Sequence, residues 1–337
     1  MKNPSSSLTS LLFPSPIATV HYKKERDMDL PSDPAASDLW FDWLMHRRQA
    51  DDVNYGQKVQ NDVEGYADRV LDGAVLKQGM TLVDLGAGDG LVGFRAIDRI
   101  GASLKVIMVD ISLPLLKFAE QSATSRGVRQ QCTFLVSSAE RLSRLDDNSV
   151  DAVATRSSLA YVADKHAALR ECFRILKPGG RLSIAEPVFH DNALAAASLR
   201  RRLESGQIDR TKSILPLVHR WHAAQYPDTD EAMHSSPIAN YTERDLLRLA
   251  QGVGFGELHL ELNISVTNSY RKSWDVFVDS SPHPLAPSLR TILEERFTAE
   301  ERRLFEAVLR PMVESSELPE TDRMAYLTAF KTPTTKS

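Results

Sequence analysis

The sequence predicts an α/β fold, with a doubly wound, mostly parallel sheet of seven strands and helical insertions that form a lid. Two observations support this fold class. From Gly79 onward, short apolar segments alternate with segments of helical periodicity, which is the pattern of strands joined by crossover helices. The apolar segments also lack a strict alternation of polar and apolar residues, as expected of strands that are buried on both faces.

The expected elements follow one another in a regular order through the middle of the chain. Strands are expected at 81–85, 104–109, 131–136, 150–155 and 181–185. Helices at 91–99, 113–125 and 166–176 connect them, because each of these segments has apolar residues at helical spacing. The Leu-Lys-Pro-Gly-Gly sequence at 176–180 predicts a turn before the fifth strand.

The remaining elements lie before the first strand and after the fifth. Helical patterns are found at 58–75, 192–226, 241–251 and, as two amphipathic helices, 285–315. Residues 257–266 alternate in the manner of a sixth strand. The last strand is expected at 324–330, with 274–279 as the competing position.

These elements define the expected domain organisation. An α/β core occupies 76–266 and contains a helical insertion at about 190–240, and a helical acceptor or lid region with the closing strand follows at 267–337. Helices precede the core at 37–75. Residues 1–36 are expected to be a flexible tail rather than a signal peptide, because prolines interrupt their apolar patch and no clean cleavage site follows.

Length and composition exclude several classes of protein. The chain has 337 residues and a formal net charge of −4, which disfavours a general nucleic-acid binder because such proteins carry an excess of basic residues. No run approaches the roughly 18 apolar residues of a membrane helix, so we expect no membrane partner and a cytoplasmic location. The two cysteines, Cys132 and Cys172, are too few for a disulfide framework, and no cluster has the spacing of metal ligands. We therefore expect two buried thiols and no metal.

The most informative stretch is Val83-Asp84-Leu85-Gly86-Ala87-Gly88-Asp89-Gly90, a glycine cluster directly after the first expected strand. Glycines at such a turn let the backbone approach a ligand closely. A literal Gly-x-Gly-x-x-Gly starts at Gly88, but we reject a dinucleotide site. In such sites the first glycine follows the strand directly, and here that glycine is Gly86. Carboxylates at Asp84 and Asp89 would also repel a pyrophosphate, so a cationic ligand fits this loop better.

An acidic residue, Asp110, ends the second expected strand. It lies 20 residues after Gly90, the spacing at which an acidic side chain reaches ribose hydroxyls in doubly wound sheets. The combination predicts a nucleoside that has no phosphates and carries positive charge beside the glycine loop. S-adenosylmethionine meets this description, because its ammonium and sulfonium suit Asp84 and the loop carbonyls while its ribose suits Asp110.

At these residues the chain resembles the class I S-adenosylmethionine-dependent methyltransferases, in particular the small-molecule branch that includes the ubiquinone/menaquinone C-methyltransferases. The resemblance covers residues 62–265 and rests on five short motifs in the family's order and spacing. They are 83–90, 109–112, 138–140, 149–153 and 176–182. The resemblance implies a Rossmann-like sheet, S-adenosylmethionine as cofactor and S-adenosylhomocysteine as its product.

The resemblance also implies roles for particular residues. The methionine moiety would be bordered by Asp84, Gly86, Ala87 and Gly88, the ribose held by Asp110, and the adenine contacted by Ile111, Ser138 and Ala139. Ser138 stands where the family more commonly has Asp, so its hydroxyl or a backbone group would supply the adenine contact. Thr155, Arg156 and Ser157 would line the methionine end and face the acceptor. Tyr55 and Tyr66 are alternative candidates for closing over the cofactor.

Candidate residues for the acceptor side follow the late strands. His190 comes off the carboxyl end of the fifth strand and Tyr161 follows the fourth, at the edge where doubly wound sheets bind ligands. Both are candidate catalytic residues, as is His219 in the helical segment, with His222 beside it. An exposed or structural role is the alternative for each histidine, and core packing is the alternative for Tyr161. The basic residues Arg200, Arg201, Arg202, Arg210, Lys212 and Arg220 form either an anion-docking site or a solvated helix face.

We therefore predict a methyltransferase that acts on an O, N, S or C atom of a small molecule, in specialised metabolism. The alternatives are a catalytically silent cofactor-binding subunit, which predicts disrupted glycines or a missing acidic ribose ligand, and a nicotinamide-dependent dehydrogenase. The related arsenite methyltransferases use several thiols, and this chain has only two cysteines. The oligomeric state stays open, with a homodimer among the expectations.

Overall fold

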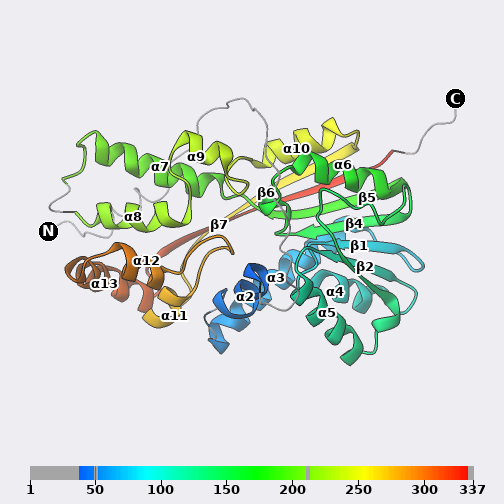
Figure 1. Cartoon of the computed structure of the whole chain (residues 1–337), viewed down its shortest axis with the longest axis horizontal. Coiled ribbons are helices and arrows are strands. Elements are labelled where there is room, and N and C mark those ends of the chain that lie inside the picture. The colour runs from blue at the N-terminus through cyan, green and yellow to red at the C-terminus, as the bar shows by residue number, and fades with distance from the viewer. Residues whose placement is uncertain (1–37, 49, 51, 210–212, 333–337) are drawn as a thin grey trace.

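The computed structural model describes residues 38–48, 50, 52–209 and 213–332. The expectations for the tail at 1–36 and for Arg210 and Lys212 therefore lie outside the described residues. Figure 1 shows two parts: a sheet flanked by helices at one end and a group of helices at the other.

Among the described residues the sheet has the predicted seven strands, in the order β3-β2-β1-β4-β5-β7-β6. They are β1 (Thr81–Leu85), β2 (Lys105–Asp110), β3 (Cys132–Val136), β4 (Val150–Arg156), β5 (Leu176–Pro187), β6 (Gly256–Asn268) and β7 (Pro319–Phe330). Strands β1 to β5 are parallel, whereas β7 runs antiparallel to both β5 and β6. The strand order reverses between β1 and β4, and the crevice at their carboxyl ends is where open α/β sheets bind ligands.

Helices cover both faces of the sheet, as a doubly wound fold requires. One face carries α3 (Val53–Ala74), α4 (Leu91–Ile100) and α5 (Leu113–Ser125), and the other carries α6 (Lys165–Ile175) and α10 (Glu243–Gly252). Most of these helices begin at a polar side chain that accepts a hydrogen bond from the first turn, namely Asp52, Ser112, Asp164 and Thr242. The exception is α4, which begins at Gly90 in the glycine loop.

Strand β5 begins five residues earlier than predicted, at Leu176. Leu176 pairs with Val150, and the pairing then shifts to Ala152 and Arg181. The Lys-Pro-Gly-Gly stretch therefore forms a bulge within the strand instead of a turn before it. Gly179 makes the bulge possible, because its φ of +87° lies in the left-handed region.

Within the described residues, six helices form a helical lobe beyond the sheet. They are α7 (His190–Glu204), α8 (Leu215–Gln225), α9 (Asp230–Ser235), α11 (Trp274–Asp279), α12 (Leu289–Arg296) and α13 (Ala299–Glu314). The insertion and the C-terminal region share one apolar core here, in which Val218, Ile292 and Phe305 are buried together. The segment 192–226 is divided between two helices. Because 274–279 is helical, the closing strand is the terminal one.

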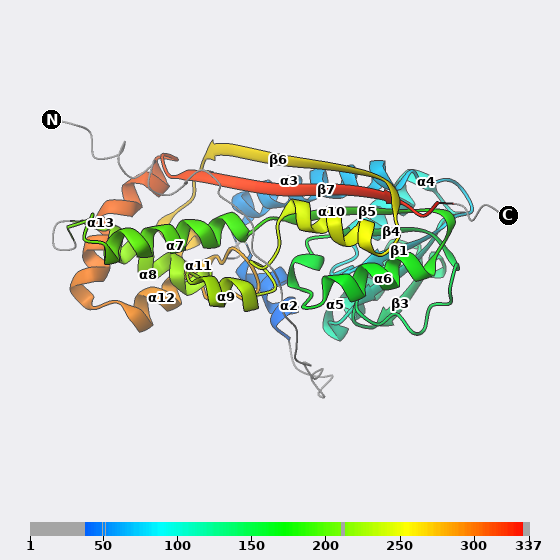
Figure 2. The ribbon, with the colours of Figure 1, turned by 90° about the horizontal axis from the view of Figure 1, so that it is seen from above.

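Strands β6 and β7 continue past the end of β5 as a two-stranded ribbon that reaches the helical lobe (Figure 2). The last pair between β5 and β7 joins Pro187 to Met324, whereas β6 stays paired with β7 as far as Pro319. Strand β7 is therefore longer than predicted. The apolar pattern marks only the part of the strand that is buried in the sheet, from Met324 onward.

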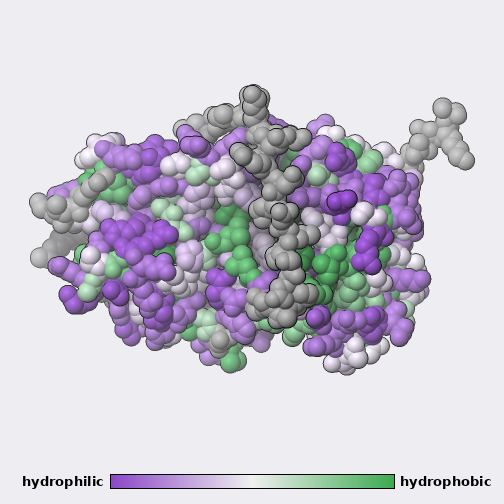
Figure 3. All heavy atoms as spheres, viewed as in Figure 1, coloured by the Kyte–Doolittle hydropathy of each residue, from purple (hydrophilic) through white to green (hydrophobic). Residues whose placement is uncertain are grey.

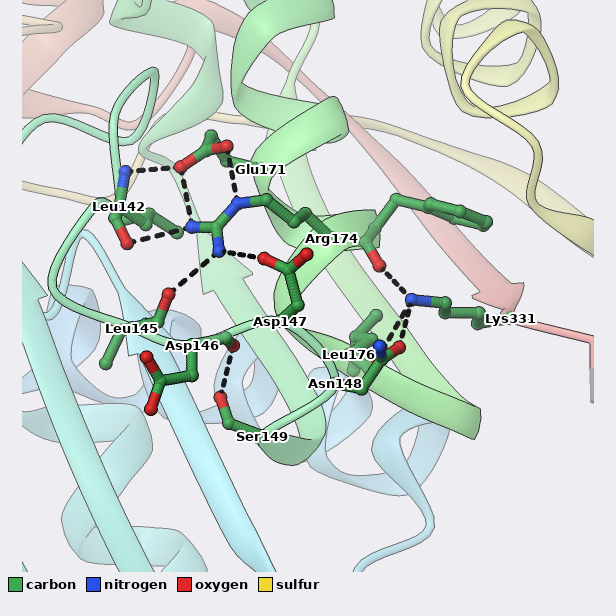
Figure 4. Close-up of polar contacts among 11 residues, drawn as sticks. Leu142, Leu145, Asp146, Asp147, Asn148, Ser149, Glu171, Arg174, Leu176 and Lys331 are labelled. Atoms are coloured by element: carbon green, nitrogen blue, oxygen red, sulfur yellow. Dashed lines mark hydrogen bonds and ion pairs between the residues drawn. The ribbon is translucent and has the colours of Figure 1, made fainter.

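A network of polar contacts lies at the amino ends of the parallel strands, opposite the crevice (Figure 4). The Arg174 guanidinium in α6 donates to two carboxylates, including that of Glu171, and to backbone carbonyls of the loop before β4. The Lys331 ammonium, just after β7, donates to Asn148 and to two carbonyls of α6 and β5. These contacts tie α6, the loop before β4 and the end of β7 together.

Three further features concern the cysteines, possible metal ligands and possible membrane spans. Cys132 and Cys172 are buried free thiols, as predicted. The described residues hold no group of three or more His, Cys, Asp or Glu side chains placed to bind a metal ion. Of the described helices, none is both long enough and apolar enough to span a bilayer.

Candidate functional site

The glycine loop, residues 86–90, leaves the carboxyl end of β1 and leads into α4. Gly86 and Gly88 have φ values of +71° and +56°, which residues with a side chain rarely adopt. A Cβ atom on Gly86 would lie 2.0 Å from the Ser158 Oγ, in the loop after β4. The two loops touch because Gly86 has no side chain.

The third glycine of the literal Gly-x-Gly-x-x-Gly, Gly93, has a packing role. A Cβ atom there would lie 2.7 Å from the Met108 Cε in β2 and 3.2 Å from an oxygen of Asp84. Gly93 thus allows α4 to lie closely on β1 and β2. Helix–strand packing accounts for this glycine, so the literal motif needs no dinucleotide.

Asp84 lies within β1, directly beneath the glycine loop, and its carboxylate is buried. Its Oδ2 accepts a hydrogen bond of 2.8 Å from the backbone N–H of Gly93. Burial raises the pKa of Asp84 to about 7, and the hydrogen bond from Gly93 and the charge of Arg156 oppose this rise only in part. A cation that approached this carboxylate would stabilise its ionised form.

Asp110 ends β2 and is also buried. Its two oxygens accept hydrogen bonds of 2.8 Å from the backbone N–H groups of Gly88 and Ser112. Burial raises its pKa, and these backbone donors oppose the rise. Asp110 therefore ties the glycine loop to the end of β2, and each oxygen keeps a second lone pair for a further donor.

The residues expected around an adenine ring lie beside Asp110. Ile111 follows it and is 40% exposed, an apolar surface available to a planar ring. In the loop after β3, Ala139 is buried in the core, and the Ser138 hydroxyl accepts a hydrogen bond of 3.2 Å from the Glu140 N–H. The Ser138 hydroxyl is therefore engaged locally, which leaves backbone groups of this loop as the alternative for an adenine contact.

The end of β4 presents polar groups to the crevice. Thr155 Oγ1 and Arg156 Nε are buried and have no hydrogen-bond partner among the residues that the structure describes. Ser157, the next residue, has a φ of +52°, a conformation that costs energy in a residue with a side chain. Unpaired buried donors and acceptors next to a strained residue are typical of a ligand site.

An N-terminal cap, residues 38–48, lies over the crevice. It consists of α2 (Leu39–Asp42) and a π-helical turn, η1 (Trp43–Arg47). The Leu44 Cδ2 would be 3.5 Å from a Cβ on Gly88, and the Trp40 ring lies 5.2 Å from that of Tyr161. On the face shown in Figure 3, hydrophobic residues gather in the middle of the molecule, between the sheet and the helical lobe.

Arg48, at the end of the cap, is a site residue that the sequence analysis missed. Burial lowers its pKa, and the nearby charge of Arg156 lowers it further, whereas Asp89 and Tyr55 act in the opposite direction. The Arg48 Nε, like that of Arg156, has no hydrogen-bond partner within the described part of the chain. Two guanidiniums whose charges act on each other and whose Nε donors are unused form a place for an anionic group such as a carboxylate. No motif in the sequence marks Arg48.

Glu186, near the end of β5, is the second residue that was missed. Its fully buried carboxylate accepts hydrogen bonds of 2.9–3.0 Å from three consecutive backbone N–H groups, those of Ser158, Leu159 and Ala160. These bonds hold the loop after β4 against Gly86. A charged residue directly after the buried pair Ile184 and Ala185 was the available signal.

The candidate catalytic residues are spread over the molecule. Tyr161 lies at the crevice, in contact with the cap. His190 begins α7, and its Nδ1 lies 2.6 Å from the Ala239 carbonyl oxygen, whereas His219 pairs with Asp228 at 2.9 Å within the helical lobe. The structure therefore places Tyr161 beside the cap and His219 in the helical lobe.

The two candidate tyrosines of α3, Tyr55 and Tyr66, lie in different surroundings. Tyr55, in the first turn, faces Arg48 and lies under the Lys272 ammonium, which is 4.3 Å from its ring. Tyr66 is hydrogen-bonded to Asp322 of β7, away from the glycine loop. Of the two alternatives, only Tyr55 is near the cap. The half-buried His222 packs its ring against Trp221 in α8, and burial lowers its pKa to about 4.

Comparisons with known proteins agree with this geometry. Residues 76–234 match a family model described as a methyltransferase domain. The ubiquinone/menaquinone biosynthesis C-methyltransferase UbiE of Idiomarina loihiensis is 34% identical over 116 residues, which cover 34% of this chain and 46% of that protein. The UbiE protein of Cronobacter sakazakii is 34% identical over 122 residues, 35% of this chain and 48% of that protein. The chain thus spans about half the length of the curated relatives it matches.

The fold has solved counterparts. The crystal structure of the YcgJ protein from Bacillus subtilis superimposes with a TM-score of 0.51 at 16% sequence identity. The superposition covers 80% of this chain and 98% of that one. At this identity the likeness concerns the fold alone.

Proposed function

We propose that this chain, whose residues 76–234 match a methyltransferase-domain model, is a class I S-adenosylmethionine-dependent methyltransferase that transfers a methyl group from that cofactor to a small-molecule acceptor. The observation that carries the proposal is the pair of buried carboxylates, Asp84 and Asp110, on the two sides of a glycine loop. A carboxylate beneath the loop suits a cation, and one at the end of β2 suits a ribose diol.

The residues present fit the cofactor. Asp84 would bind the ammonium group, Asp110 the ribose hydroxyls, and the exposed Ile111 the adenine ring. Thr155 and Arg156 would line the methionine moiety, because their unused buried polar atoms lie at the end of β4. Arg48 would pair with the methionine carboxylate, so the ammonium and the carboxylate on the α-carbon would each have a partner of opposite charge.

The bound cofactor would supply an electrophilic methyl group. The chain's own contribution is alignment and exclusion of water. Glu186 holds the loop after β4 in place, and the cap covers the glycine loop through Leu44. Tyr161 and His190 are the candidates for orienting the acceptor or taking its proton.

Isothermal titration calorimetry with S-adenosylmethionine, S-adenosylhomocysteine and a nicotinamide dinucleotide tests the cofactor. We expect the first two to bind and the dinucleotide to fail. Binding of the dinucleotide alone would replace the proposal by a dehydrogenase. A screen of candidate acceptors, with mass detection of methylated products, then tests transfer; cofactor binding without any product from a broad screen would favour the silent subunit.

The two UbiE proteins compared above are C-methyltransferases by name, whereas the residues of the crevice are compatible with O, N, S or C as the acceptor atom. A place in specialised metabolism, a cytoplasmic location and a homodimer remain predictions made from the sequence.

A further inference from the structure

A buried histidine with an unused nitrogen lies where the sheet meets the helical lobe. His283, in the loop between α11 and α12, is 1% exposed. Its Nε2 lies 2.9 Å from the backbone carbonyl oxygen of Gln225, and because a carbonyl can only accept, Nε2 carries the proton. The lone pair of Nδ1 has no hydrogen-bond partner among the described residues.

Aromatic rings pack beside the His283 ring and link it to the crevice. The His283 ring lies 5.3 Å from the rings of both Phe189 and Tyr226. Phe189 follows β5 and lies 6.5 Å from Tyr161, which in turn contacts Trp40 of the cap. The series of rings therefore runs from the cap over the glycine loop, past the carboxyl ends of β4 and β5, to His283.

The cap also holds the loop that carries His283. The Ser281 N–H donates to the Arg47 carbonyl at 3.1 Å, and the Trp43 indole N–H donates to the Ser281 carbonyl at 3.2 Å. The Arg47 guanidinium donates to the carbonyls of Pro284 and Ala286, both at 3.3 Å. The orientation of the imidazole is thus set from one side by α8 and from the other by the cap.

We propose that His283, Phe189 and Tyr226 form the acceptor-binding site, and that the His283 Nδ1 accepts a hydrogen bond from a hydroxyl group of an uncharged aromatic acceptor. This inference rests on the proposed methyl transfer and names the acceptor class for it. His283 is then a specificity-determining residue: the rings bind the flat apolar body of the acceptor, and the nitrogen selects a hydroxyl.

The chemistry of the site favours this class. A buried acceptor without a donor costs roughly 1–3 kcal/mol, which a ligand hydroxyl recovers. Burial lowers the pKa of His283 to about 4, so the imidazole stays neutral at physiological pH and its lone pair stays available. A ligand that lacks a donor leaves the nitrogen unpaired, and a phenolate would place a negative charge against it. Discrimination by a buried polar group of this kind exceeds what apolar contact alone provides.

Nitrogen NMR of the full chain, labelled with [15N]histidine and saturated with S-adenosylhomocysteine, tests the proposal without turnover. The probes are p-cresol and 4-methylanisole, which differ in the hydrogen-bond donor. We expect p-cresol to shift the unprotonated Nδ1 resonance of His283 upfield and 4-methylanisole to leave it in place. The proposal is overturned if p-cresol leaves the Nδ1 resonance in place. This includes the case in which a bound water has already shifted that resonance.

Two variants assign the resonance and separate the two ring nitrogens. In His283→Gln the amide N–H can still reach the Gln225 carbonyl but no acceptor replaces Nδ1, whereas His283→Asn keeps an acceptor near the Nδ1 position. We expect His283→Gln to weaken p-cresol binding about threefold to tenfold and His283→Asn to weaken it less. Equal losses in the two variants would contradict a role for Nδ1. If S-adenosylhomocysteine itself fails to bind, the proposed function fails; if it binds and Nδ1 is silent, only this inference fails.

Discussion

Replacing Asp84 by Asn separates the cost of the buried charge from its use in binding. Asparagine has the same shape, and its oxygen can still accept the 2.8 Å hydrogen bond from the Gly93 N–H. The pKa of Asp84 rises from its ordinary 3.8 to about 7 on folding. At about 1.4 kcal/mol per unit, keeping this carboxylate ionised in the cofactor-free protein costs about 4 kcal/mol above neutral pH.

The sign of the pH dependence follows from the raised pKa. Below pH 3.8 Asp84 is protonated in both the folded and the unfolded chain, so its protonated form contributes fully to the stability of the folded chain. This contribution is lost as the pH rises through about 7, because the unfolded chain ionises freely and the folded one does not. Urea unfolding at about pH 5 and about pH 8 should therefore show the stability of Asp84→Asn, relative to the parent, increasing by about 2–3 kcal/mol at the higher pH.

Cofactor binding should respond in the opposite direction. The ammonium needs the ionised carboxylate, so the affinity of the parent for S-adenosylmethionine should rise about a hundredfold between about pH 5 and about pH 8. Asp84→Asn should bind at least about tenfold more weakly at pH 8 and lose this dependence. Because the α-amino group of the cofactor also titrates near pH 8, the variant serves as the reference for that effect.

A matched control is available at the amino ends of the strands, opposite the proposed cofactor site. Asp151, at the start of β4, accepts a hydrogen bond from the Thr81 N–H and pairs with Lys177. Calorimetry should find the affinity of Asp151→Asn and its pH dependence unchanged. The reasoning is refuted if Asp84→Asn binds the cofactor as the parent does, or if its stability relative to the parent is the same at both pH values.

Three further substitutions test other parts of the site. Asp110→Ala should weaken cofactor binding at least about tenfold in calorimetry, and unchanged affinity would remove the ribose assignment. Gly86→Ala should abolish cofactor binding and lower the melting temperature, because the new Cβ would lie 2.0 Å from the Ser158 Oγ. Adding Ser158→Gly to the same chain should restore part of both losses. If nothing is restored, the positive φ of residue 86 and not the contact with Ser158 is the cause. Glu186→Gln keeps one acceptor oxygen for three N–H donors, so it should lower the free energy of unfolding in urea by about 2–4 kcal/mol. An unchanged free energy of unfolding would mean that the loop after β4 does not depend on the Glu186 carboxylate.

The sheet was predictable because each of its buried strands leaves a local pattern in the sequence. Each buried strand is a short apolar run, and the glycine cluster after β1 marks the strand-to-helix turn without reference to the rest of the chain. The predicted strands at 81–85 and 131–136 therefore agree closely with β1 and β3. Errors arose where pairing, not composition, sets the length, as at the bulge in β5 and the ribbon of β6 and β7.

The helical lobe was less predictable because its core is assembled from distant segments. Apolar residues of α7 and α8 meet those of α11 to α13, and no local pattern states which amphipathic faces will pack together. The sequence suggested an insertion and a separate C-terminal region over the sheet. In the structure the two share one core beside the sheet, joined to it by the β6–β7 ribbon.

The sequence alone determined the place of the proposed cofactor site, because the glycine loop and the two acidic residues that flank it lie within one βαβ unit, where spacing along the chain dictates position in space. The tertiary structure decided what faces that unit. Arg48, Glu186 and His283 come from segments far apart in the chain, and their roles depend on burial and on which hydrogen-bonding groups remain unpaired. Burial is a property of the folded molecule, so no reading of residue types could have selected His283 from the nine histidines of this chain.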